Sequence, residues 1–92
     1  MTGKRLLVLA RRDHTEAMRV AAGLTLADNT VTLVFMDRPV EETPQNVAHY
    51  EMVETCGVAV ATTVPVLGTQ LPLWDAAALA RAIAHSQGVV SV

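Results

Sequence analysis

Four short runs of apolar residues are spaced along the chain, and they predict buried strands. The runs cover residues 4–10 (KRLLVLA), 30–36 (TVTLVFM), 57–63 (GVAVATT) and 89–92 (VVSV). Apolar residues at consecutive positions are typical of strands that are buried on both faces, as in a parallel sheet. We therefore expect four strands in one parallel sheet.

Three segments with helical spacing lie between these runs, over residues 15–27, 44–56 and 75–87. Each begins at a residue that can cap a helix N-terminus, and these residues are Asp13, Thr43 and Asp75. Asn29 is predicted to adopt the left-handed conformation after the first helix, and Gly57 is predicted to close the second. Strands and helices therefore alternate along the chain.

This alternation predicts an α/β fold. Parallel strands need crossover connections, and right-handed crossovers place helices on the faces of an open sheet. A chain of 92 residues is long enough for one domain, residues 1–92. We expect a small open parallel sheet of about four strands with three helices. Ligands of such sheets bind beyond the carboxyl ends of the strands, where the strand order reverses, next to the first strand.

The composition indicates that part of the surface is covered by a partner. Hydrophobic residues make up 51% of the chain and charged residues 17%. A domain of this size has little interior in which to bury so much apolar surface. The long loop over residues 62–74 is itself apolar, so it should be covered. We expect a homo-oligomer or a hetero-complex.

Several function classes are disfavoured. A net charge of −2 and only three aromatic residues argue against a nucleic-acid ligand. No apolar run approaches the length of a membrane span or a signal peptide, and one cysteine cannot form an internal disulfide, so we expect a cytoplasmic protein. No GxGxxG or P-loop motif occurs. His49 and His85 lack a second ligand at metal spacing, so neither a metal nor a cofactor is expected.

Polar residues follow the predicted strands where a ligand would bind. Arg11, Arg12, Asp13 and His14 end the first strand, and Thr62-Thr63 ends the third. In one interpretation, Arg11, Arg12, His14, Thr62 and Thr63 form a pocket for a small anion, with the arginines holding its charge and His14 sharing a proton. In the other, Asp13 caps the helix and Arg11, Arg12 and His14 are solvated.

Cys56 is the single sulfur nucleophile. Its spacing from Met52 and Val53 points it toward the core, and the C-terminal end of a helix disfavours a thiolate. Unpaired cysteines are often buried, which favours a structural role. The alternative is a catalytic Cys56 that carries a persulfide, assisted by His49 or Glu54.

The overall pattern resembles the DsrE/DsrF/DsrH-like superfamily, which includes the TusB, TusC and TusD sulfur-relay proteins. The resemblance lies in residues 4–36, in 52–65 (MVETCGVAVATTVP) and in the ending 73–92 (LWDAAALARAIAHSQGVVSV). It implies an oligomer of small flavodoxin-like parallel-sheet subunits, in which active members carry a persulfide on a cysteine. That cysteine follows a strand similar to residues 57–61 or lies in the first helix. This chain has Thr62 and Thr63 at the first position and no cysteine at the second.

Three hypotheses follow. The first is an accessory or scaffold subunit linked to intracellular sulfur transfer, with related DsrE-like subunits or a sulfur-carrier protein as partners. The second is a sulfurtransferase that uses Cys56, with Arg11, Arg12 and His14 binding the donor or acceptor. The third is a small-anion-binding or regulatory domain that uses the Arg11–His14 corner. The sequence leaves open whether the protein is an enzyme.

Overall fold

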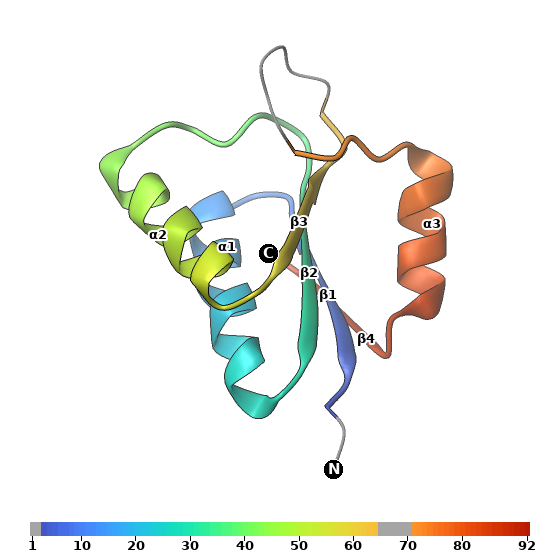
Figure 1. Cartoon of the computed structure of the whole chain (residues 1–92). Coiled ribbons are helices and arrows are strands. Elements are labelled where there is room, and N and C mark those ends of the chain that lie inside the picture. The colour runs from blue at the N-terminus through green and yellow to red at the C-terminus, as the bar shows by residue number, and fades with distance from the viewer. Residues whose placement is uncertain (1–2, 65–70) are drawn as a thin grey trace.

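The four predicted strands form one parallel sheet in the computed structural model, which describes residues 3–64 and 71–92 (Figure 1). The strands are β1 (Arg5–Ala10), β2 (Thr30–Phe35), β3 (Ala59–Thr62) and β4 (Gly88–Ser91). Their order is β3-β2-β1-β4, and each neighbouring pair is parallel. The prediction of a small open α/β sheet of the flavodoxin-like kind is therefore confirmed. Residues 65–70 of the predicted apolar loop lie outside the described residues.

The helices begin at the predicted caps. They are α1 (His14–Leu24), extended by the 3-10 turn η1 (Thr25–Ala27), α2 (Pro44–Thr55) and α3 (Ala76–His85). The side chains of Asp13, Thr43 and Asp75 each accept a hydrogen bond from a backbone N–H in the first turn. Each cap satisfies a donor that the helix leaves unpaired.

The left-handed residue after the first helix is Asp28, with φ 62°, so the prediction of Asn29 is wrong. Asn29 instead joins two segments through its amide, which donates to the Leu24 carbonyl at 2.9 Å and accepts from the Lys4 N–H at 3.0 Å. Because the turn η1 continues the helix to Ala27, the left-handed residue is Asp28, one position earlier than predicted. Gly57 has φ 77°, as predicted for a residue that closes α2.

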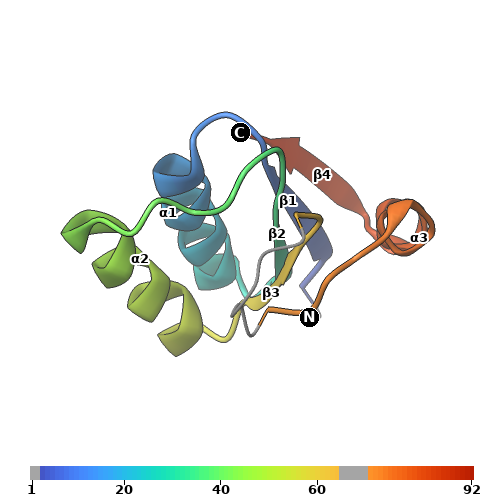
Figure 2. The ribbon, with the colours of Figure 1, turned by 90° about the horizontal axis from the view of Figure 1, so that it is seen from above.

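The two faces of the sheet are covered unequally. Helices α1 and α2 lie on one face and α3 on the other (Figures 1 and 2). The larger core lies under α1 and α2, and its fully buried side chains include Val8, Met18, Leu33 and Phe35. The smaller core consists of Leu7, Val34 and Ala61, against which Trp74 and Ala82 pack. Helix α3 has no buried residue of its own.

The strand order reverses between β1 and β4, because the chain proceeds from β1 to β2 and β3 and then crosses back to the far side of β1. The switch point therefore flanks the first strand, as predicted. There the backbone N–H groups of Arg11 and Arg12 both donate to the Val92 carbonyl, at 2.8 and 2.9 Å. Among the described residues, no helix has the length and apolarity needed to span a membrane.

Candidate functional site

The carboxyl ends of β1, β2 and β3 meet at one edge of the sheet, so the predicted rim residues are gathered there. Arg11 and Arg12 follow β1, and both are exposed. Arg38, which follows β2, donates from its guanidinium to the carbonyls of Arg11 and Arg12. This contact ties the β1–α1 turn to the β2–α2 connection. Arg38 therefore holds the corner together through the backbone, a role that the sequence pattern did not indicate.

His14 is buried, with only 5% of its surface exposed, so the expectation that it is solvated is wrong. Its Nε2 lies 3.0 Å from the Met36 carbonyl, and because a carbonyl can only accept, Nε2 carries the proton. The ring also meets Phe35 edge-on, with centroids 5.2 Å apart and planes at 61°. His14 is thus a hydrogen-bonded core residue that joins the start of α1 to the end of β2.

The side chains of Thr62 and Thr63 differ in how much of them is exposed at the surface. Thr62 is buried, its hydroxyl donates to the Phe35 carbonyl at 3.2 Å, and it accepts from the Val64 N–H at 3.1 Å. Its backbone also bonds to Pro72 and Trp74. Thr63 is half-buried, and its N–H donates to the Phe35 carbonyl at 3.0 Å. Thr62 therefore closes the end of β3, whereas Thr63 keeps a side chain at the surface.

Cys56 lies at the opposite edge of the sheet from these residues. It caps the C-terminus of α2, just before β3 begins, and is half-buried against the larger core. Strand β3 has four residues, which span about 13 Å. The structure therefore does not bring Cys56 together with Arg11, Arg12 or His14, and a joint site of the thiol and these residues has no geometric support.

A buried polar cluster joins α1 to the segment before α2, and sequence reasoning missed it. Asn46 is 7% exposed, and its amide donates to the Glu41 carbonyl at 2.8 Å. The same amide accepts from the Thr15 hydroxyl at 2.5 Å. An asparagine in the first turn of a helix is a weak signal, since it is common there as a capping residue. The cluster is satisfied internally and therefore has a structural role.

The remaining histidines bond within their own helices. Nδ1 of His49 lies 2.8 Å from the Gln45 carbonyl, and Nδ1 of His85 lies 2.8 Å from the Arg81 carbonyl. Within residues 3–64 and 71–92, no group of three or more His, Cys, Asp or Glu side chains is close enough to hold a metal ion.

Three of the described groups have shifted pKa values, and two of them form one ion pair. A hydrogen bond from Arg19 lowers the pKa of Glu16, and the pair is exposed on α1. Burial raises the pKa of Tyr50 on α2, and the negative charge of Glu54 adds to the effect. The Tyr50 phenol therefore keeps its proton at neutral pH.

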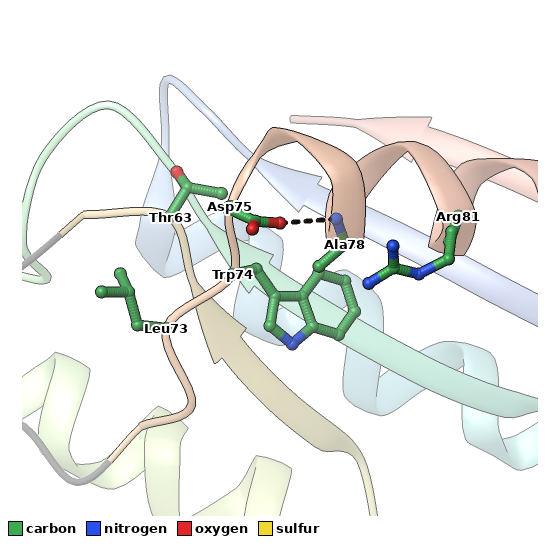
Figure 3. A pocket seen from close by; sticks show the side chains of 6 residues that line it. All are labelled: Thr63, Leu73, Trp74, Asp75, Ala78 and Arg81. Carbon is green, nitrogen blue, oxygen red and sulfur yellow. Dashed lines mark hydrogen bonds between the residues drawn. The ribbon is translucent and has the colours of Figure 1, made fainter.

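A hollow of about 540 Å³ opens beside α3 at the end of β3 (Figure 3). The residues that line it are Thr63, Leu73, Trp74, Asp75, Ala78 and Arg81. Thr63 is the one residue of the predicted anion site that reaches this hollow. Its size falls within the range of pockets that hold small molecules.

The fold and its carboxyl edge define a small open parallel α/β domain whose C-terminal rim carries arginines and threonines but no thiol. Comparison of the chain with protein-family models, with curated proteins and with solved structures found no match.

Proposed function

We propose that this chain is an accessory, non-catalytic subunit of the DsrE-like class, which forms a homo-oligomer in the cytoplasm and is linked to intracellular sulfur transfer. One observation carries the non-catalytic part. At the end of β3, where active members of that class hold their cysteine, Thr62 is buried and bonded to the Phe35 carbonyl. Neither Thr62 nor Thr63 carries a thiol, so no persulfide can form at that position.

The two alternatives have less support. A sulfurtransferase would need Cys56 close to groups that stabilise a thiolate, yet its nearest ionisable neighbour in sequence is the carboxylate of Glu54 and it lies at the negative end of α2. An anion bound at the Arg11–His14 corner could not use His14 as a ligand, because His14 is buried and already bonded to the Met36 carbonyl. Arg11 and Arg12 alone remain available there.

The outer edge of β4 supports assembly with a second copy. Strand β4 pairs only with β1, so its other edge has no strand neighbour among the described residues. Natural edge strands usually carry charges or proline that prevent pairing, but β4 reads GVVS and exposes Val89 (44%) and Val90 (37%). Ile83, in α3 shortly before β4, is 43% exposed.

A twofold axis perpendicular to the sheet would pair β4 of one copy antiparallel with β4 of the next. Side chains on one face of the sheet stay on that face under this rotation. With the axis at either valine, that valine therefore lies opposite its own copy. Val–Val cross-strand pairs are favourable, and the same surface serves both subunits, as a closed dimer requires.

The protein is therefore expected to be a dimer or a larger oligomer of dimers by size-exclusion chromatography with light scattering. The double variant Val89→Lys/Val90→Lys should shift it to monomers, because like charges would face each other across the pair. The double variant Val47→Lys/Met52→Lys on α2 is the matched control, since these side chains are 52% and 37% exposed, and it should leave the mass unchanged. A monomeric wild-type protein, or equal effects of the two variants, would refute the assembly.

The thiol of Cys56 should load sulfur no faster than a free thiol. We expect intact-mass measurements after exposure to inorganic polysulfide to show slow sulfur addition, at the rate of glutathione in the same mixture, and none in Cys56→Ser. A rate tenfold or more above glutathione would make Cys56 a sulfur carrier and contradict the non-catalytic assignment.

The link to sulfur transfer is tested in the host cell. Deletion of the gene that encodes this chain should lower the pool of protein persulfides, and an unchanged pool would contradict the link.

A further inference from the structure

We propose that the hollow beside α3 is a binding site for a small planar aromatic carboxylate, held between the indole of Trp74 and the guanidinium of Arg81. Both side chains line the hollow, together with Leu73 and Ala78 (Figure 3). The site lies at the β3 end of the sheet, away from the outer edge of β4. It therefore depends neither on the proposed assembly nor on the role in sulfur transfer.

The guanidinium of Arg81 supplies a positive charge that is not paired with any of the described side chains. Its side chain is exposed, and no ion pair, hydrogen bond or cation–π contact of its guanidinium is present within residues 3–64 and 71–92. Figure 3 shows the guanidinium extending back along α3 toward the indole of Trp74. A guanidinium presents two parallel N–H donors, which match the two oxygens of a carboxylate.

Trp74 supplies a flat apolar wall. One part of the side chain packs on the smaller core of Leu7, Val34 and Ala61. The side chain is only half-buried, however, and its remaining surface borders the hollow. The indole N–H has no acceptor among the described residues. An aromatic ligand can stack on such a ring or meet it edge-on. The site therefore favours a planar aromatic ligand over an aliphatic one.

Asp75 decides the charge and the orientation of the ligand. Its carboxylate caps α3 by accepting from the Ala78 N–H at 2.8 Å, and it also lines the hollow. A second negative charge at that end disfavours a dianion such as a phosphate monoester, so a single carboxylate suits the site better. The ligand carboxylate should lie at Arg81, with its ring toward Trp74 and Leu73.

Benzoate is a suitable probe, and Trp74 is a built-in reporter because it is the single tryptophan of the chain. We expect benzoate to change the tryptophan fluorescence with a Kd of about 1 mM. Benzamide, which keeps the ring without the charge, and acetate, which keeps the charge without the ring, should each bind about tenfold more weakly or worse. Absence of benzoate binding, or equal binding of benzamide, would overturn the proposal.

Variants locate the bound carboxylate. Arg81→Gln should weaken benzoate about tenfold, because a charge-assisted pair is lost. Arg12→Gln, a matched change of an exposed arginine at the switch point, should have no effect. Asp75→Asn keeps a capping side chain but removes the charge, so it should strengthen benzoate binding about twofold. If Arg81→Gln and Arg12→Gln behave alike, or if Asp75→Asn weakens binding, the carboxylate does not lie at Arg81 and the proposal fails.

Discussion

Replacing His14 by alanine is expected to lower the free energy of unfolding by about 2–4 kcal/mol. The substitution removes a buried ring that packs edge-on against Phe35. It also deprives the Met36 carbonyl of its hydrogen bond from Nε2. A cavity and an unsatisfied polar group would thus arise together at the junction of α1 and β2. Urea denaturation followed by far-UV circular dichroism measures the change.

The control for this prediction is His85→Ala. His85 is exposed in the last turn of α3, where its contact is with a carbonyl of the same helix. Its loss should cost less than about 1 kcal/mol. If the two variants are equally stable, the ring of His14 does not contribute to the core, and its availability to a ligand at the rim becomes the better interpretation.

The sheet and its connections could be predicted because their causes are local. Consecutive apolar residues define the strands, and a side chain that caps each helix fixes where the helix begins. Asp13, Thr43 and Asp75 all cap as expected. The usual arrangement of such small sheets places the switch point next to β1, and right-handed crossovers then place the helices on the two faces.

The environment of His14 could not be predicted because it depends on contacts distant in sequence. His14 sits in a run of polar residues, RRDH, which locally indicates a solvated turn. Its burial arises because β2 ends beside it, so Phe35 and the Met36 carbonyl meet the ring. Arg38 illustrates the same limit, since its partners are backbone carbonyls that lie 26 and 27 residues earlier in the chain.

Helix α3 is less buried than its hydrophobic sequence indicates. Helix α3 reads AAALARAIAH, yet none of its residues is buried. Alanine side chains are short, so a helix rich in alanine covers the sheet without inserting deeply into it. Its Ala82 is only partly buried against the smaller core, and Trp74, just before the helix, makes the other contact. This thin packing explains why a hollow remains beside α3 and why Arg81 has no partner among the described residues.

The single substitution with the largest expected effect is Phe35→Ala, at about 3–5 kcal/mol. Phe35 is 1% exposed and is the largest of the fully buried side chains. It occupies the last position of β2, opposite Ala10 of β1 and Thr62 of β3. Domains of this size are usually stable by about 5–15 kcal/mol, so the loss removes a large share of the total. Urea denaturation gives the magnitude.

The position of Phe35 in the core predicts more than a loss of stability, because its backbone and its ring act on different parts of the rim. The carbonyl of Phe35 accepts from the hydroxyl of Thr62 and the N–H of Thr63, and alanine retains that carbonyl. The ring supports His14, and alanine cannot replace it.

The double variant His14→Ala/Phe35→Ala should therefore lower the free energy of unfolding by less than the sum of the two single variants. The difference should be about 0.5–1.5 kcal/mol, because the single variants each count the same lost ring pair. Phe35→Leu should recover most of the stability, and Met52→Ala, at a side chain that is 37% exposed, should cost less than about 1 kcal/mol. Strict additivity of the two ring deletions would show that the ring contact contributes nothing to the stability of the fold.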